Sequence, residues 1–174
     1  MKNKQNLVIV ICLIFITFFI LLLGLKKENN YLPQTTHFKI EDTLTLQSLY
    51  SDKKLFLNDL FLKDNFTLIN IWASWCLPCK DEHPYLINLN KNYNLNIIGI
   101  NYKDDSNNAK NFLFELGNPY REVLIDNDGV KSIELGAIGV PETYLVNKEK
   151  KIIKKFIGPL NQNNFKEILN IVKK

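Results

Sequence analysis

The residues whose types and spacing most clearly predict chemistry are two cysteines, Cys76 and Cys79, separated by Leu77 and Pro78. They lie in the segment NIWASWCLPCKDEHP, residues 70–84, where an apolar, strand-like run meets a charged, helix-prone one. Two cysteines at this spacing can bind a metal, attach haem or exchange disulfides. The surrounding sequence decides among these three chemistries.

Disulfide exchange is favoured because the other two chemistries lack residues that they require. A zinc site would need further ligands, and the sequence offers His37 and His83 but no second cysteine pair. Covalent haem attachment would need a histidine directly after Cys79, where the chain has Lys80. We therefore expect a redox-active disulfide and no metal or other cofactor.

A position at the start of a helix would give the two sulfurs different roles. Free backbone N–H groups and the helix dipole stabilise a thiolate there, so Cys76 is the expected attacking sulfur. Cys79, one turn further, is the expected resolving sulfur. Pro78 suits the first turn, where its missing N–H costs nothing, whereas Pro84 lies deeper and is expected to kink the helix.

Two tryptophans stand next to the cysteines. Trp72 is expected to pack inward, as most tryptophans in such a run do. Trp75, directly before Cys76, is expected to form a flat exposed surface against a substrate.

The elements that must position the cysteines alternate between strands and helices. Apolar runs bounded by turn residues predict strands over residues 66–74, 95–102, 121–126, 142–147 and 151–158. Apolar residues at helical spacing predict helices after Cys76 and over residues 106–117, 127–135 and 161–174. Ser106 is a plausible N-cap and Gly117 a plausible stop of their helix. With edge strands at 37–60, the order predicts an α/β sandwich with a hairpin added at the end.

The first part of the chain predicts a membrane anchor. Residues 7–25 are 19 consecutive positions without a charge, close to the ~20 apolar residues that a membrane helix needs. A cleaved signal peptide would have a shorter apolar region and a small-residue cleavage site, so retention is favoured over cleavage. We expect an anchor at 1–28, a tether at 29–36 and a domain at 37–174, with Cys12 an ordinary residue of the span.

The charges beside the span favour a cytoplasmic N-terminus and a domain on the other side of the membrane. They also account for three of the chain's four net positive charges, which leaves about +1 for the domain. The domain has a single arginine, Arg121, and 46% of the chain is hydrophobic. We therefore expect a well-packed domain that binds no nucleic acid.

Several motifs together resemble a known family. WASWCLPCK and the later GVPET look like a thioredoxin-fold protein. NIWASWCLPCKDEHPYL, NYKDD, ELGNPY and GVPETYLV, in this order, resemble the DsbE/CcmG family, the membrane-anchored thiol:disulfide interchange proteins of bacterial cytochrome c maturation. The likeness runs from about His37 to the C-terminus.

The resemblance implies a thioredoxin-like fold, with a central mixed sheet flanked by helices, held on the inner membrane and facing the periplasm. The implied client is apocytochrome c or another maturation thiol protein, and the implied electron donor is a transmembrane dithiol carrier. It also implies a cis peptide before Pro141, a Val140 backbone that pairs with an extended client, and client specificity from neighbours such as Glu142.

One position departs from general thioredoxins. Asn70 stands six residues before Cys76, where thioredoxins keep a buried acid that assists the inner cysteine. The resemblance suggests Glu82 as the replacement, with Glu142 as a second acid; the alternative is that Glu82 simply faces solvent. For His83, a functional role and an ordinary place on the helix surface both remain open. The NYKDD segment at 101–105 is interpreted as a solvated loop.

Three other functions remain open at this point. One is a broader TlpA-like or ResA-like reductase of exported proteins, which would use the same chemistry. Another is a metal-binding assembly chaperone, although such sites generally have wider cysteine spacing and a partnered histidine. The third is peroxide reduction, although peroxidases of this fold do not centre on such a pair.

Overall fold

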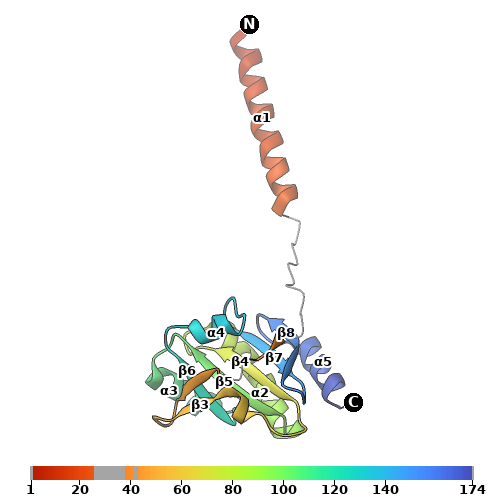
Figure 1. The fold of residues 1–174 in the computed structure, drawn as a ribbon. Helices are drawn as coiled ribbons and strands as arrows, with labels where there is room; N and C mark the ends of the chain where they lie inside the picture. Colours follow the sequence, from red (N-terminus) through yellow and green to blue (C-terminus); the bar gives the residue numbers. More distant parts are fainter. Residues whose placement is uncertain (1, 26–37, 41–42, 174) are drawn as a thin grey trace. The chain divides into compact units, whose positions relative to one another are not determined.

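The computed structural model describes residues 2–25, 38–40 and 43–173, which belong to two separate units (Figure 1). The first unit comprises Met1–Gln34 and the second Thr35–Lys174. The tether predicted at 29–36 lies outside the described residues.

The first unit contains one long helix, α1 (Lys2–Leu25). Its window Lys4–Leu21 has a mean hydropathy of 2.3. At 1.5 Å per residue, the 24 residues of α1 extend for about 36 Å, more than the ~30 Å hydrocarbon core of a bilayer. By length and composition α1 is therefore a candidate membrane span, as the sequence predicts.

The second unit is built on one mixed sheet. Within the described residues the sheet has eight strands in the order β1-β8-β7-β4-β5-β6-β2-β3. The strands are β1 (Phe38–Lys39), β2 (Thr45–Ser48), β3 (Lys54–Phe56), β4 (Thr67–Trp72), β5 (Asn96–Tyr102), β6 (Glu122–Asp126), β7 (Glu142–Val146) and β8 (Lys151–Ile157). Only the β4–β5 and β5–β6 pairs are parallel. The predicted α/β alternation with a terminal hairpin is confirmed.

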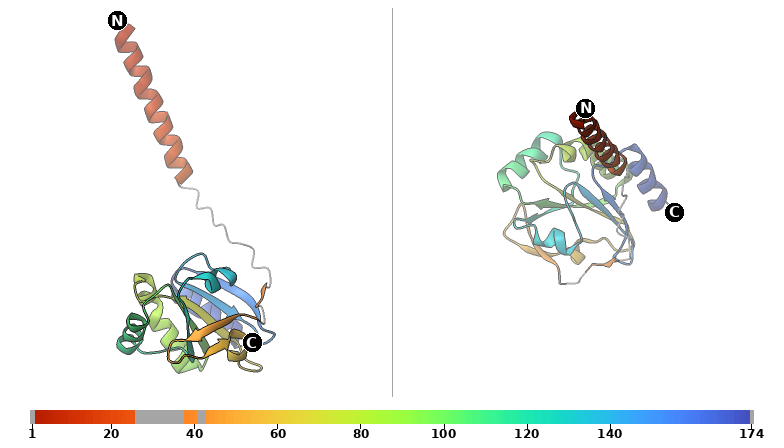
Figure 2. Two further views of the ribbon diagram at one scale, coloured as in Figure 1. Left: turned by 60° about the vertical axis from the view of Figure 1, so that its left-hand side comes forward. Right: turned by 90° about the horizontal axis from the view of Figure 1, so that it is seen from above.

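Helices cover both faces of the sheet. The described helices of this unit are α2 (Leu77–Tyr93), α3 (Ser106–Leu116), α4 (Val130–Glu134) and α5 (Gln162–Val172), with a 3-10 turn at Leu57–Leu60. One apolar core joins the sheet to α2, α3 and α5, and a second joins its other face to the β2–β3 region and the end of α4. Figure 2 shows the same division, with the cyan α4 opposite the other three helices.

The central strand β4 divides its side chains between these two cores. Leu68 and Trp72 belong to the core under α2, whereas Ile69 and Ile71 belong to the opposite one. This alternation follows from the two-residue period of a strand. It places the intervening Asn70 on the α2 side, where a polar residue needs a hydrogen-bonding partner.

The start of α3 differs by one residue from the sequence prediction. Asp105, not Ser106, is the N-cap, and its carboxylate accepts hydrogen bonds from the backbone N–H groups of Asn107 and Asn108 at 2.9 and 3.0 Å. Both residue types cap helices, so their adjacency left the boundary ambiguous. Gly117 ends the helix with a φ of 86°, as predicted.

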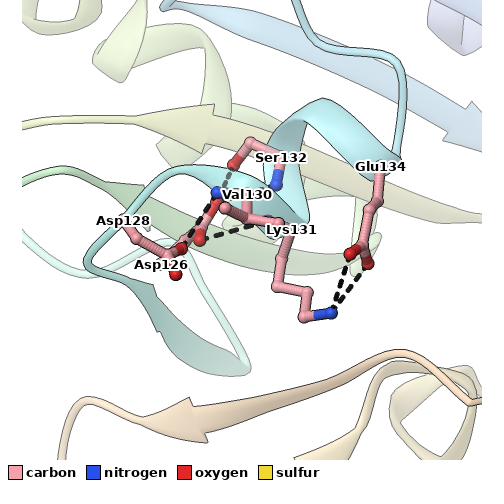
Figure 3. A network of polar contacts seen from close by, with 6 residues as sticks. All are labelled: Asp126, Asp128, Val130, Lys131, Ser132 and Glu134. Carbon is pink, nitrogen blue, oxygen red and sulfur yellow. Dashed lines mark hydrogen bonds and ion pairs between the residues drawn. The ribbon is translucent and has the colours of Figure 1, made fainter.

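A network of polar contacts holds the short helix α4 (Figure 3). The Asp126 carboxylate accepts hydrogen bonds from the backbone N–H and the hydroxyl of Ser132 at 2.7 and 2.6 Å. Asp128 accepts one from the Val130 N–H at 3.0 Å, and Lys131 pairs with Glu134 at 2.8 Å. Because five residues are too few to form a stable helix alone, these bonds fix the segment that leads into residues 136–141.

Gly99, in the middle of β5, allows a close approach of two rings. The indole of Trp72 and the ring of Tyr120 stack with centroids 5.6 Å apart. A Cβ atom at position 99 would lie 2.9 Å from both Trp72 Nε1 and Tyr120 Cγ. These buried rings have little room to move, so the position requires glycine.

We expect Gly99→Ala to destabilise the domain by about 1–3 kcal/mol, because the added methyl group overpacks the Trp72–Tyr120 stack. Urea unfolding of the oxidised protein measures the difference. Gly139→Ala is the matched control, since a Cβ there meets nothing within 4 Å. Equal stabilities for the two variants would contradict the packing argument.

Candidate functional site

Cys76 and Cys79 form a disulfide at the point where β4 gives way to α2. Their sulfur atoms are 2.08 Å apart and their Cα atoms 5.3 Å apart. Cys76 is the N-cap of α2, and its Sγ accepts a hydrogen bond from the Cys79 N–H at 3.2 Å. The strand-to-helix position predicted from the sequence is confirmed. The helix continues through Pro84 to Tyr93.

Two large apolar side chains are exposed beside the disulfide, although the sulfurs themselves are buried. Cys76 and Cys79 are 4% and 2% exposed, whereas Trp75 and Leu77 are 59% and 71% exposed. A groove of about 460 Å³ lies beside Cys76, between the start of α2 and one side of α3. Its lining includes Ser74, Trp75, Cys76, Leu77, Asn108 and Phe112. Trp72 is buried and Trp75 exposed, as predicted.

The loop before β7 lies at the same end of the sheet as the cysteines. The bond between Val140 and Pro141 is cis, as the family resemblance implies. Because β4 and β7 are antiparallel and Ile71 pairs with Glu142, the end of β4 and the start of β7 are neighbours. Val140 lies two residues before Glu142, the first residue of β7, and is half-buried against both cores.

Glu82 lies inside the domain, so the solvent-facing alternative is wrong. Its side chain has no exposed surface. Oε1 accepts a hydrogen bond from Asn70 Nδ2 at 2.7 Å, and Oε2 accepts one from the Leu160 N–H at 2.8 Å. Burial raises the pKa of Glu82 to about 7, although both hydrogen bonds act in the opposite direction.

Asn70 connects Glu82 to two further side chains. Its Oδ1 accepts a hydrogen bond from the Tyr120 hydroxyl at 2.7 Å, and its Nδ2 also lies 3.0 Å from Thr143 Oγ1. Burial raises the pKa of Tyr120, and the nearby Glu82 carboxylate raises it further. Sequence reasoning identified the missing acid at position 70 but did not find this network. The strand period, which puts Asn70 on the α2 side, was the available signal.

Glu142 does not face a client, which differs from the expectation. It is 1% exposed, and its Oε1 accepts hydrogen bonds from the backbone N–H groups of Ile138 and Gly139 at 2.8 and 3.2 Å. Its Oε2 accepts a hydrogen bond from the Tyr144 hydroxyl and pairs with Lys155 Nζ, both at 2.9 Å. A buried carboxylate needs such partners, and here they hold the loop that contains Pro141.

His83 is also buried, so of its two alternatives the ordinary place on the helix surface is wrong. It is 3% exposed, and its Nε2 lies 2.8 Å from the Gly117 carbonyl oxygen, to which it donates a hydrogen bond. The ring meets Phe112 edge-on at a centroid distance of 5.2 Å. Burial lowers the pKa of His83. These contacts attach α2 to the end of α3.

The part of the chain that the structure describes has no candidate metal centre. No group of three or more His, Cys, Asp or Glu side chains lies there in a position to hold a metal ion.

Comparison with known proteins agrees with this geometry. The Redoxin family model matches residues 27–172. The thiol:disulfide interchange protein CycY of Rhizobium leguminosarum is 50% identical over 111 residues, which are 64% of this chain and 60% of that protein. The thiol:disulfide interchange protein DsbE of Vibrio cholerae is 39% identical over 145 residues, which are 83% of this chain and 74% of that protein.

A solved structure gives the same result for the fold. The thiol:disulfide interchange protein of the thioredoxin family from Chlorobium tepidum has a TM-score of 0.63 at 19% identity, over 80% of this chain and 98% of that one. At this identity the likeness concerns the fold alone, and it confirms the predicted thioredoxin-like fold. The family model and the sequence relatives show that the chain belongs to the Redoxin family and, within it, to the DsbE thiol:disulfide interchange proteins.

Proposed function

We propose that this protein is a thiol:disulfide oxidoreductase that reduces disulfides during cytochrome c maturation. The observation that carries the proposal is the Cys76–Cys79 disulfide at the N-terminus of α2, one helical turn before a buried acid. The relatives CycY and DsbE support the chemistry, since they are named as thiol:disulfide interchange proteins. The pathway comes from the resemblance to the DsbE/CcmG family. The client is apocytochrome c or another thiol protein of the same pathway.

The reaction starts from the reduced protein. The Cys76 thiolate, stabilised by the helix N-terminus and by the Cys79 N–H, attacks one sulfur of the client disulfide. A Cys76–client disulfide forms and the client's other sulfur leaves as a thiolate. Cys79 then loses its proton and attacks the Cys76 sulfur, which releases the second client thiolate. Two electrons pass to the client, and the Cys76–Cys79 disulfide remains.

Glu82 is the acceptor of the Cys79 proton in this scheme. The two residues are three positions apart on α2 and therefore lie on the same helical face. A pKa of about 7 makes both the acid and the carboxylate accessible near neutral pH, as a proton acceptor requires. Asn70, which donates to Oε1, holds the carboxylate in place.

The client binds across the exposed surface beside Cys76. Trp75 provides an exposed aromatic face, and Val140 and Pro141 provide a backbone edge with which an extended segment can pair. Glu142 contributes by holding that loop and not by touching the client.

The proposed function includes a location for the protein. Helix α1 anchors the protein in the inner membrane, and the domain faces the periplasm. A reductase in an oxidising compartment needs a source of electrons, so a transmembrane dithiol carrier re-reduces the disulfide.

Cells that carry Cys76→Ser are expected to lack mature c-type cytochromes, because the disulfide in the haem-binding segment of the apocytochrome stays closed. Haem-stained gels measure the loss. Addition of a small thiol, or deletion of the periplasmic dithiol oxidase, should restore much of it. Normal cytochrome levels would reject the pathway, and loss of other exported proteins instead would favour the broader reductase.

In the reduced protein, alkylation at mildly acidic pH is expected to label Cys76 before Cys79. Cys76 is the N-cap, where the helix dipole stabilises a thiolate, whereas Cys79 lies a turn inside above a buried acid. Mass spectrometry of timed samples identifies the labelled residue. Equal or reversed labelling would overturn the assignment of the attacking sulfur.

Stability of the oxidised protein should fall as the pH rises from about 4.5 to 7. The pKa of Glu82 is raised from 4.5 to about 7 on folding, so the folded state binds its proton more tightly. The stabilisation is complete below pH 4.5 and is lost as the pH rises through this window. Since one pKa unit corresponds to about 1.4 kcal/mol, the loss is on the order of 3 kcal/mol. Urea unfolding across this range measures it.

Glu82→Gln should flatten that pH dependence, since the titrating group is gone. Glu115→Gln is the matched control, because it removes an exposed carboxylate from α3 and should keep the wild-type slope. A Glu82→Gln protein with the wild-type slope would show that another group causes it.

A further inference from the structure

The loop that follows β5 makes direct contact with the two residues before Cys76. Asp104 Oδ2 accepts a hydrogen bond from the Ser74 backbone N–H at 2.6 Å, and its Oδ1 accepts one from the Ser74 hydroxyl at 2.7 Å. The indole N–H of Trp75 donates to the Lys103 carbonyl oxygen at 3.0 Å. This segment contains the NYKDD motif, to which the proposed reaction assigns no role.

The sheet explains why these segments meet. β4 and β5 are parallel, and Trp72 pairs with Asn101, so both chains leave the sheet at the same edge. Asn101 Nδ2 donates to Asp104 Oδ2 at 2.9 Å, and the Lys103 N–H donates to the Asp126 carbonyl oxygen at 3.0 Å. Lys103 has a φ of 45°, an uncommon conformation for a lysine that the surrounding bonds maintain. The loop is therefore held by the segment after β4 on one side and by the end of β6 on the other.

We propose that Asp104 is a positioning residue that fixes Ser74 and Trp75 as a rigid platform for a polypeptide client beside Cys76. The inference rests on the proposed reductase function. Within that function, Ser74 and Trp75 are the part of the site that selects an extended client. Trp75 is 59% exposed, and its hydrogen bond to Lys103 sets the direction of its ring. Without the Asp104 contacts, the segment that carries the ring would be free to move.

A carboxylate is the group that this position requires. Ser74 presents two donors to Asp104, and Asn101 and the Asp105 N–H present two more. Two carboxylate oxygens accept all four, with the added strength of charge-assisted bonds. An asparagine has one acceptor oxygen and would turn an NH₂ group toward a donor, so Asp104→Asn disrupts the contact at nearly constant volume.

The test compares two substrates of the reduced protein. Hydroxyethyl disulfide has no polypeptide chain that could lie along Trp75, whereas a synthetic peptide with an oxidised Cys-x-x-Cys-His segment has one. Asp104→Asn and Ser74→Ala are each expected to lower the ratio of peptide to hydroxyethyl disulfide rate constants about tenfold. In a Trp75→Ala background, Asp104→Asn should not lower the ratio further. An unchanged ratio in both single variants would overturn the proposal.

Asp105→Asn is the matched control for charge. It removes one carboxylate from the adjacent residue, and asparagine caps a helix as well as aspartate does, so α3 keeps its N-cap. The ratio should stay at the wild-type value. A fall equal to that of Asp104→Asn would show that the loop acts through its charge, which would also overturn the proposal.

A second measurement needs no substrate. Hydrogen exchange followed by NMR should find the Ser74 amide and the Trp75 indole proton protected in the wild-type protein and unprotected in Asp104→Asn. If the wild-type protein reduces neither disulfide, the proposed function fails, while this measurement still decides the role of Asp104. Exchange that is equal in the two proteins would reject that role.

Discussion

The amide of Asn70 is the contact on which the arrangement of the site depends. It lies on the central strand β4 and bonds to Glu82 of α2, to Thr143 of β7 and to Tyr120 before β6. Through Glu82 the same network reaches the Leu160 N–H before α5. A buried amide or carboxylate without partners would cost several kcal/mol, so these elements are held in one arrangement. That arrangement sets where α2 begins, and therefore where Cys76 and Cys79 lie.

Three acids lie on α2 or on the segments next to the end of β4, and their partners give them different roles. Glu142 has the Lys155 cation and three hydrogen bonds, and Asp104 accepts four hydrogen bonds while remaining half-buried. Glu82 has two hydrogen bonds and, among the described residues, no ion pair. Burial without a cation favours the neutral acid, which is why its pKa is raised to about 7. Glu82 is thus suited to accept a proton, whereas the other two acids are suited to hold loops.

The sequence predicted those features that depend on neighbouring residues. The cysteine spacing, the apolar run before it and the proline after Cys76 together indicate a helix N-terminus, and α2 begins there. The partners of the acids could not be predicted in this way. Asn70 and Tyr120 are 50 positions apart, and Lys155 meets Glu142 through the pairing of β7 with β8. Such contacts depend on sheet order and register, which a local pattern does not encode.

The same reasoning explains why the exposure of titratable residues was predicted less well than that of apolar ones. Glu142 follows a proline in a loop and His83 follows a glutamate on a helix, and both residue types are usually exposed. Each is buried here because backbone groups satisfy it: the nearby Ile138 and Gly139 N–H groups for Glu142 and the distant Gly117 carbonyl for His83. Backbone partners carry no side-chain signature, so the sequence cannot indicate them. What the sequence can indicate is the chemistry, since Cys76 and Cys79 are close together in the chain and form a disulfide with each other.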